Sequence, residues 1–443
     1  MDMLTKVSNA LKSIFLKHAE ESNSQAKAVK RRRKFTPSSL AQTFILAFLK
    51  NPNATFEDIA CMAVASGVDV SPQAIEQRYS SSLELFFKLL FENMTRFVIN
   101  SDESLAPILD RFSEVILIDS SSVSLPDSQE DEYQGCGGTY SRGKAALKLQ
   151  TELDLRSGGL RCIEIEQGRA PDGASVRQHI EQTAGSLRIS DLGYFNIPVL
   201  RKIDDSKAYF LTRIQHQVKV FVDGTKHDLV TWLNSKQAGV VDRQVEIGLS
   251  EQYACRLIAY RVPEVLANRR RQKLIKAHRS KYGRQPSAAS LAACDWEFMV
   301  TNLPLDELSV EEAIVLYRAR WQIELLFKRW KSHGLIAQMD VSNDIIQMTK
   351  FWIRLCAALI QHWLIVATAW SPTHCLSFDK IARRIRDFVR EIATQLSALG
   401  DVKSVLDEIC RSVRVGCKLN RRRKKPGTLS LLRDPTSLDY VLT

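Results

Sequence analysis

One segment of the 443-residue chain, residues 310–331, combines a carboxylate with a phenol and two basic side chains at helical spacing. Relative to Glu324, the other three side chains are Tyr317 at −7, Arg320 at −4 and Lys331 at +7. In a helix with about 3.6 residues per turn, these offsets bring all four side chains into a strip about 60° wide. The pattern predicts a helix face that carries one carboxylate among hydrogen-bond donors.

Such a face suits the binding of a metal ion together with a phosphate group. A glutamate can ligate a hard cation, while guanidinium and ammonium groups bind phosphate oxygens. Lys328, four residues after Glu324, borders the same strip and adds another cation. The alternative interpretation is an exposed amphipathic face with i,i+4 ion pairs, such as Arg320 with Glu324 and Glu324 with Lys328.

Two aspartates stand where short apolar runs end. Residues 114–118 (EVILI) precede Asp119, and residues 186–190 (SLRIS) precede Asp191. Runs of this kind are typical of buried strands. Three carboxylates from distant parts of a chain can hold two divalent cations, which activate a water or a hydroxyl group and stabilise the leaving oxygen. A single aspartate at a strand end is also a common turn former, so each aspartate by itself is weak evidence.

The types of possible ligand indicate which metal to expect. Oxygen-only ligands favour Mg²⁺, and we expect two such ions, for which Mn²⁺ can substitute. The eight histidines show no ligand pattern. Nine scattered cysteines without a CxxC pair argue against a zinc ribbon or a full disulfide framework and fit a reducing cytoplasm.

The segments between these residues indicate a mixed α/β sheet. Residues 146–155 and 160–166 alternate between apolar and polar side chains and predict a hairpin, whereas residues 174–185 predict a helix. Residues 207–304 are mostly β-like and are interrupted by a basic helical stretch at residues 263–281. Helical patterns then continue to the C-terminus.

The N-terminal region contains a candidate helix-turn-helix. Thr55 can cap a first helix, and Ser71 followed by a proline can cap a second one, residues 72–82. In this interpretation Gln73, Gln77 and Arg78 face the DNA bases. A plain helical bundle explains the same pattern.

The charge of the chain predicts a polyanionic partner. Lys and Arg outnumber Asp and Glu by 62 to 50, and they are concentrated in residues 27–34, 269–284 and 421–425. A single basic run is typical of a solvated face. Three runs distributed along the chain favour double-stranded DNA.

The sequence predicts a cytoplasmic protein that associates with the nucleoid when it is bound to DNA. Residues 1–20 lack the continuous apolar core of a signal peptide. Residues 351–370 nearly reach the length of a membrane span, but Arg354, Gln361 and His362 interrupt them. We therefore expect a buried helix and no membrane partner.

The helical spacing also carries a resemblance to a known family. Tyr317, Arg320, Glu324 and Lys331 match in full the Tyr-Arg-Glu-Lys signature of the IS-four group of bacterial insertion-sequence transposases, which includes the Tn-five type. The chain is therefore similar to a DDE transposase, an enzyme that cuts and rejoins DNA with metal ions held by two aspartates and a glutamate.

The upstream aspartates resemble the same family. Asp119 in ILIDSSSV is similar to its first catalytic aspartate, and Asp191 in ISDLGYF is similar to its second. The resemblance implies an α/β fold with an RNase H-like mixed-sheet catalytic core, a β-rich insertion before Glu324, and helical N- and C-terminal regions.

The resemblance also implies roles beyond the metal ligands. Such transposases nick the transposon end, form a DNA hairpin, open it and insert the excised element elsewhere. Tyr317, Arg320 and Lys331 would then hold phosphates, and Trp296 resembles the tryptophan on which a flipped base stacks. As an isolated tryptophan in an apolar strand, Trp296 also fits a core position, and we expect the other two tryptophans near Glu324, Trp321 and Trp330, to pack in the core.

Six regions follow from these patterns. They are a basic N-terminal segment (1–36), a helical DNA-binding domain (37–108), the first part of the catalytic core (109–206), the β-rich insertion (207–304), the last part of the core (305–371) and a helical C-terminal region (372–443). Synapsis of two DNA ends in this family implies a homodimer, and we expect the helices after Pro372 to form the contact between its two copies.

Two other functions stay open at this point. One is a helix-turn-helix regulator without catalysis, which leaves the spacing of Tyr317 to Lys331 as a coincidence. The other is an RNase H-like nuclease that cuts DNA but does not transpose, which differs from a transposase in whether the cut ends are joined to a target.

Overall fold

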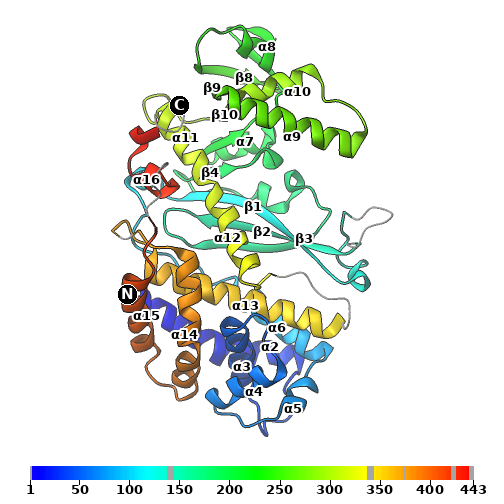
Figure 1. Cartoon of the computed structure of the whole chain (residues 1–443), viewed down its shortest axis with the longest axis vertical. Coiled ribbons are helices and arrows are strands. Elements are labelled where there is room, and N and C mark those ends of the chain that lie inside the picture. Colours follow the sequence, from blue (N-terminus) through cyan, green and yellow to red (C-terminus); the bar gives the residue numbers. More distant parts are fainter. Residues whose placement is uncertain (1, 137–143, 337–343, 374, 421–425, 439–443) are drawn as a thin grey trace. The chain divides into compact units, whose positions relative to one another are not determined.

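The computed structural model describes residues 2–136, 144–336, 344–373, 375–420 and 426–438 (Figure 1). The chain divides into two compact units. The helical unit comprises Met1–Leu105, Ser120–Ala170 and Ile323–Arg421, and the sheet unit comprises Ala106–Asp119, Pro171–Gln322 and Arg422–Thr443.

Most helices belong to the helical unit (Figure 1). They are α1 (Met3–Lys12), α2 (Ala19–Ala26), α3 (Pro37–Lys50), α4 (Phe56–Ala65), α5 (Pro72–Glu76), α6 (Ser81–Met94), α12 (Trp321–Ser332, from Ile323 onward), α13 (Asp344–Ala369), α14 (Phe378–Ser397) and α15 (Val402–Gly416). This unit also holds the antiparallel hairpin of β2 (Ala146–Asp154) and β3 (Leu160–Gln167), which confirms the predicted hairpin.

The sheet unit alternates strands with shorter helices. Its strands are the first half of β1 (Val115–Ser124), β4 (Leu187–Ser190), β5 (Tyr209–Arg213), β6 (Lys219–Val222), β7 (Thr225–Asp228), β8 (Val240–Ile247), β9 (Tyr253–Arg261) and β10 (Trp296–Thr301). Its helices are α7 (Ile197–Asp205), α8 (Leu229–Asn234), α9 (Glu264–Tyr282), α10 (Ala288–Ala292), α11 (Val310–Ala319) and α16 (Thr428–Arg433).

The strands form one mixed sheet in the order β3-β2-β1-β4-β5-β10-β9-β8-β6-β7. The pairs β1/β4 and β4/β5 are parallel, whereas β5/β10, β10/β9 and β9/β8 are antiparallel. Parallel strands are covered on both faces, which explains why residues 115–118 of β1 and all of β4 are buried. The predicted fold class, a mixed α/β core with helical N- and C-terminal regions, is confirmed.

Helix α13 is the apolar segment for which a membrane span was considered. By length and composition it could cross a bilayer, but 94% of its most apolar window is buried inside the protein. Arg354 donates from Nε to the carbonyl of Pro52 at 3.0 Å, and His362 Nε2 lies 2.7 Å from the carbonyl of Gly158. The predicted buried helix is confirmed, and two of its three polar interruptions, Arg354 and His362, meet partners inside the helical unit.

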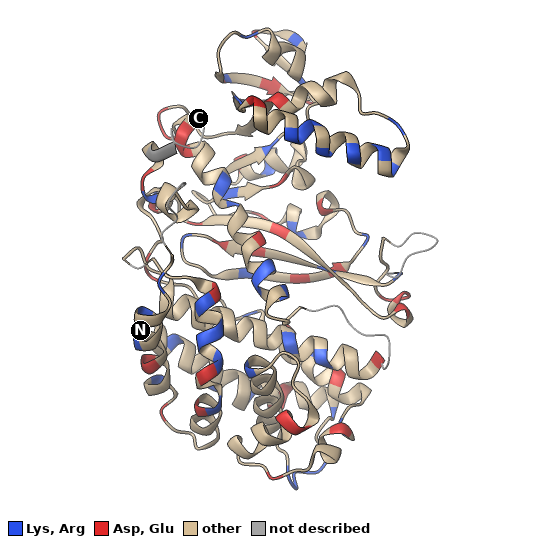
Figure 2. Ribbon diagram, viewed as in Figure 1, with Lys and Arg blue, Asp and Glu red and all other residues tan. Residues whose placement is uncertain are grey.

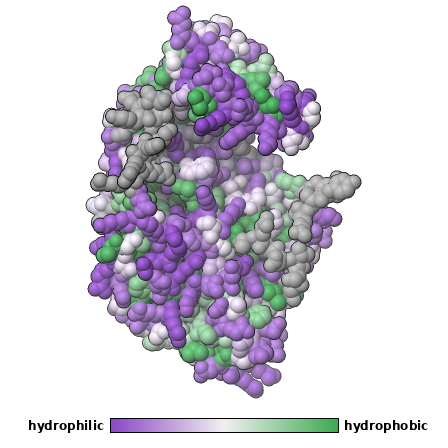
Figure 3. All heavy atoms as spheres, viewed as in Figure 1, coloured by the Kyte–Doolittle hydropathy of each residue, from purple (hydrophilic) through white to green (hydrophobic). Residues whose placement is uncertain are grey.

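The visible face of the chain is mostly hydrophilic, with its apolar residues in small separate patches (Figure 3).

Two local predictions are wrong. Residues 174–185 form no α-helix but short 3₁₀ turns, the second spanning Val176–His179. The apolar residues at helical spacing, Val176 and Ile180, are 65% and 42% exposed, so a helix here would have no apolar face to bury. The second helix of the helix-turn-helix candidate ends at Glu76, because Ser80 caps the next helix, α6.

The segment predicted as one helix at residues 310–331 consists of α11 and α12 with Arg320 between them. Arg320 itself has α-helical backbone angles, φ −50° and ψ −33°. Its N–H donates to the carbonyl of Tyr317 at 3.1 Å, a bond over three residues instead of four. The helical path therefore tightens at Arg320.

Candidate active site

The sheet register places the two aspartates side by side. In the parallel pair β1/β4, Ile118 is the partner of Ser190, so the next residues along the two strands are Asp119 and Asp191. Neighbouring strands lie about 4.8 Å apart. Asp191 keeps an extended backbone, φ −78° and ψ 170°, so the alignment continues to it. Both carboxylates thus stand in the sheet unit where the parallel pairing of β1 with β4 ends, a place we call the sheet edge, and both are partly exposed. Asp191 directly follows the last residue of β4, whereas the strand that was predicted to end at Asp119 continues to Ser124.

A third strand adds an arginine to this row. In the parallel pair β4/β5, Ser190 is the partner of Thr212, and the next residue of β5 is Arg213. The side chains of Ser190 and Thr212 are joined by a hydrogen bond of 3.1 Å beneath the row. Arg213 was not predicted as a site residue, because the sequence does not show that β5 pairs with β4. The one signal available was its position at the end of the β-like run YFLTR.

Two residues of the signature complete the part of the site in the sheet unit. Arg320 Nη1 lies 3.4 Å from Asp119 Oδ2, and the two side chains are 14% and 17% exposed. Tyr317 is buried, and the guanidinium of Arg213 lies over its ring at 5.5 Å. Burial raises the pKa of Tyr317, which Arg213 and Arg320 partly counteract. The phenol is therefore protonated at neutral pH and can donate a hydrogen bond.

The remaining residues predicted for this helix face lie on α12 in the helical unit. Glu324 is partly exposed, and Lys328 and Lys331 are exposed. Among the described residues, no group of three or more His, Cys, Asp or Glu side chains is placed so that it could hold a metal ion. The structure thus brings Asp119 and Asp191 together and leaves the role of Glu324 as a prediction.

The chemistry of the two aspartates fits a divalent oxygen-seeking cation. Two carboxylates at neighbouring register positions repel each other, and a cation between them relieves that repulsion. Arg320 beside Asp119 already shows negative charge at this edge balanced by a cation. The donor set is oxygen-only, as Mg²⁺ prefers.

The three tryptophans near the site differ in their exposure. Trp296 is 2% exposed within the apolar core of the sheet unit. Its Nε1 donates to Asn234 at 2.8 Å and Arg261 covers its ring at 4.7 Å, so it offers no open face for a base. Trp330 is buried as predicted, whereas the core position predicted for Trp321 is wrong, since it is 51% exposed.

The base-facing residues predicted in the N-terminal region also differ from one another. Gln73 and Gln77 are exposed on and just after the short helix α5. Arg78 is half-buried with its guanidinium over the Phe35 ring at 5.0 Å, and burial lowers its pKa. Arg78 is therefore engaged inside the helical unit, whereas the two glutamines are accessible.

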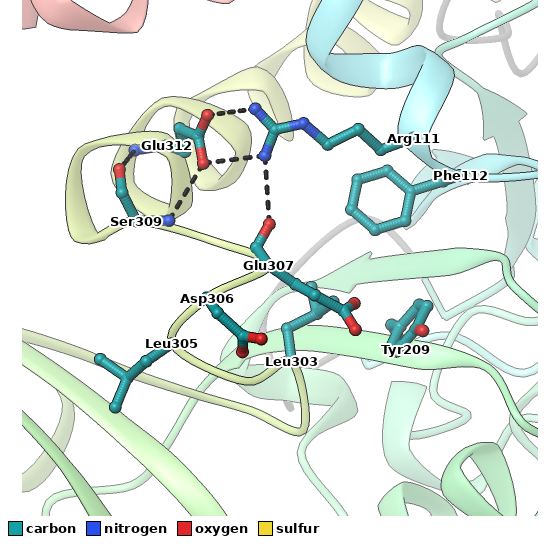
Figure 4. Close-up of a pocket in the computed structure, with 9 residues that line it drawn as sticks. All are labelled: Arg111, Phe112, Tyr209, Leu303, Leu305, Asp306, Glu307, Ser309 and Glu312. Atoms are coloured by element: carbon teal, nitrogen blue, oxygen red, sulfur yellow. Dashed lines mark hydrogen bonds and ion pairs between the residues drawn. The ribbon is translucent and has the colours of Figure 1, made fainter.

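A pocket of about 530 Å³ opens at the start of α11 (Figure 4). Arg111 crosses it, forming an ion pair through Nη2 with Glu312 and donating from Nη1 to the Glu307 carbonyl at 3.1 Å. Glu312 also accepts from the N–H of Ser309, the cap of α11, at 3.0 Å. This pair lowers the pKa of Glu312 and raises that of Arg111. The pocket thus surrounds a structural ion pair that fixes the helix carrying Tyr317.

The comparisons with known proteins agree with this geometry. Residues 110–360 match the family described as Transposase DDE domain. The chain is 27% identical over 335 residues to the transposase for insertion sequence element IS231F of Bacillus thuringiensis subsp. israelensis, covering 71% of this chain and 70% of that protein. It is 25% identical over 322 residues to the transposase for IS1151 of Clostridium perfringens, with 66% of each chain covered.

A third relative matches a shorter part of the chain. The putative transposase InsL for insertion sequence element IS186A of Escherichia coli (strain K12) is 29% identical over 247 residues, covering 54% of this chain and 61% of the relative. The family match, together with a mixed sheet that aligns two aspartates, identifies an enzyme. The family match covers more than half of the chain, so the chain belongs to the DDE transposases, and its relatives place it in the IS-four group.

Proposed function

We propose that this transposase excises and inserts an insertion sequence with two Mg²⁺ ions held by Asp119, Asp191 and Glu324. The observation that carries the proposal is the register of β1 and β4, which aligns Asp119 with Asp191 at one sheet edge. When bound, such ions lower the pKa of the attacking water or 3′-hydroxyl and stabilise the leaving oxygen.

The cationic side chains of the site would hold the DNA strand that is cut. Arg320 and Arg213 present guanidinium groups beside the aspartates, and each suits bidentate binding of a phosphate. The neutral phenol of Tyr317 can donate to a phosphate oxygen without adding charge. Lys331 and Lys328 on α12 supply point charges for the neighbouring phosphates.

We propose a hairpin intermediate on the transposon end, as in the Tn-five type that the signature resembles. Hairpin formation requires a base to leave the stack and an aromatic ring to receive it. Trp296 was the predicted ring, but it is buried in the core. Trp321 directly follows Arg320 and is 51% exposed, so we propose Trp321 as the platform instead.

We further propose that residues 37–108 bind the transposon ends, with Gln73 and Gln77 as the accessible readers of bases. The active form would be a homodimer that holds two ends, with residues 372–443 as the contact between copies. Light scattering of the protein with and without end DNA tests the second statement, since one copy per end pair would exclude it.

Single substitutions at the sheet edge test the proposed chemistry. Asp119→Asn and Asp191→Asn should each lower Mg²⁺-dependent nicking at least a thousand-fold, because losing one carboxylate removes a metal ligand. The substrates are labelled duplexes made from the DNA that flanks the coding region. Asp205→Asn, at an exposed carboxylate of α7 in the same unit, is the matched control and should cut normally.

Three results would separate the possible functions. Nicking by Asp119→Asn or Asp191→Asn at the wild-type rate would refute the metal site. Nicking without joining of the 3′-ends to a target plasmid would indicate a nuclease that does not transpose. Specific binding without any nicking in Mg²⁺ or Mn²⁺ would indicate a regulator.

A further inference from the structure

Helix α9 in the sheet unit has one face that packs and one that does not. Ala267 is its fully buried residue, and Arg270, Arg271, Leu274 and His278 on the same side are partly buried. The opposite side is exposed along the 19 residues of the helix, a length of about 28 Å. The packed side fixes the helix, so the exposed side has a defined orientation within its unit.

Ion pairs attach the packed face to β10 and to the 3₁₀ turn, Ala293–Asp295, that precedes it. Arg270 pairs through Nη2 with Glu297 and donates from Nη1 to the Trp296 carbonyl at 3.2 Å. Arg271 pairs with Asp295. The Glu297 side chain is 6% exposed and also pairs with Arg213 of the candidate active site. One buried carboxylate therefore joins α9 to the row that contains Asp119 and Asp191.

The exposed face carries cations that have no acidic partner. Arg269, Lys273 and Lys276 fall within about 60° around the helix axis, and no ion pair is present at any of the three within the described chain. Between Asn268 and Arg284 the sequence contains no Asp or Glu. Figure 2 shows the resulting row of Lys and Arg along α9.

This arrangement is unfavourable for the helix by itself. Cations three and four residues apart repel each other, and a solvated helix face usually alternates acidic and basic residues that attract. Arg269 and Lys273 are four apart, and Lys273 and Lys276 are three apart. The lack of acidic residues along this segment distinguishes α9 from an ordinary solvated face, and a polyanion bound there would replace the repulsion with attraction.

We propose that the outer face of α9 binds the phosphate backbone of duplex DNA without regard to sequence. The proposal rests on the proposed function, which supplies DNA as the polyanion, and adds a contact surface outside the catalytic residues. Flexible ammonium groups spaced about one turn apart suit phosphates and do not read bases. Through Glu297, this surface and Arg213 belong to the same packed part of the sheet unit.

The test compares two double variants with equal loss of charge. Lys273→Gln/Lys276→Gln neutralises the outer face of α9, whereas Lys202→Gln/Lys226→Gln neutralises two exposed lysines elsewhere in the sheet unit. Binding of a random-sequence 40-base-pair duplex is measured by fluorescence anisotropy across a series of salt concentrations. Each phosphate contact contributes roughly 0.9 to the slope of log affinity against log salt.

The α9 variant should bind about ten-fold more weakly near 0.1 M salt, with a slope smaller by about 2, while the control keeps the wild-type slope. Equal slopes for the two variants would overturn the proposal. So would a loss confined to an RNA duplex or to anionic vesicles, because the surface would then serve another polyanion.

Nicking of saturating end DNA should be unchanged in the α9 variant, so this binding result does not depend on the catalytic assignment. If the wild-type protein binds DNA but does not nick it, the proposed function fails while the binding surface remains testable.

Discussion

The sheet edge at Asp119 and Asp191 and the buried helix α13 both interrupt apolar runs with polar side chains, yet the two regions use them differently. In α13, the polar groups are buried, and Arg354 and His362 meet backbone carbonyls of the helical unit. At the sheet edge, the carboxylates are partly exposed and Asp119 faces the side chain of Arg320. Backbone partners are fixed by the fold, whereas a side-chain partner can turn toward a ligand.

Because of this difference, substitutions in the two regions should affect different properties of the protein. Substitutions at the sheet edge should lower activity and leave the free energy of unfolding nearly unchanged, because the groups are partly solvated. Substitutions in α13 should do the reverse, because they expose or leave unpaired a buried polar group. The division between residues needed for activity and residues needed for stability can be tested at individual positions.

After the two aspartates, Arg213 is the residue whose substitution should lower the nicking rate the most. Arg213→Gln should lower the nicking rate about a hundred-fold, since removing one preformed charge donor from such a site typically costs that much. Its side chain is 42% exposed and Glu297 keeps Arg270 as a partner, so the thermal midpoint should hardly change. Single-turnover nicking and thermal unfolding measure the two quantities.

Arg243→Gln is the matched control for Arg213, because Arg243 is an exposed arginine of the same unit that pairs with Asp223. It should nick at the wild-type rate. If Arg213→Gln loses less than three-fold in rate but unfolds many degrees earlier, Arg213 is a structural residue and the division between the regions fails there.

His362 tests the prediction that the polar residues of α13 contribute to stability. Burial lowers its pKa to about 4, against an ordinary value near 6.5, and the hydrogen bond to the Gly158 carbonyl only partly opposes this. The native state therefore binds fewer protons than the unfolded state between these values. The contribution of His362 to the free energy of unfolding is complete above pH 6.5. It declines as the pH falls toward 4, by up to about 3 kcal/mol.

His362→Gln can still donate to the Gly158 carbonyl but does not titrate. In this variant the free energy of unfolding should therefore fall less as the pH is lowered. Amide hydrogen exchange of α13, corrected for the intrinsic effect of pH, measures the local stability at pH 7 and pH 4.5. His179→Gln, at an exposed histidine, is the control and should keep the wild-type dependence. An identical decline in His362→Gln and the wild type would show that His362 is not the titrating group.

The sequence could supply those site residues whose evidence is local. Asp119 and Asp191 were predicted from the apolar runs that precede them, and the register of β1 and β4 aligns the two runs. Arg213 could not be found in this way, because its place beside Asp191 depends on the pairing of two strands that are distant in the sequence. Local patterns identify where an apolar run ends, while tertiary pairing decides which runs lie side by side.

Exposure was the least predictable property. The helical periodicity at residues 174–185 suggested a helix, but Val176 and Ile180 face solvent and only 3₁₀ turns form. Trp321 was expected in the core but is 51% exposed, whereas Trp296 takes the core position that its apolar strand also allowed. Whether an aromatic ring is covered depends on distant elements, such as Asn234 and Arg261 around Trp296, which no local pattern reveals.

The two tryptophans give the smallest of the expected effects and the sharpest test of exposure as a guide to function. Trp321→Ala should lower the ratio of hairpin to nicked product about ten-fold, because stacking on one base is worth roughly 1–3 kcal/mol. The first nick and the thermal midpoint should be nearly unchanged, since the ring is 51% exposed. Denaturing gels of a labelled end duplex resolve both products.

Trp296→Phe provides the contrast, because it removes the hydrogen bond to Asn234 while keeping an aromatic ring in the core. It should lower the thermal midpoint and leave the ratio of hairpin to nick unchanged. If instead Trp296→Phe reduces that ratio and Trp321→Ala does not, the buried ring must leave the core to receive the base. Exposure in the DNA-free protein would then be a poor guide to the platform, because DNA binding would rearrange the strand β10 on which Trp296 lies.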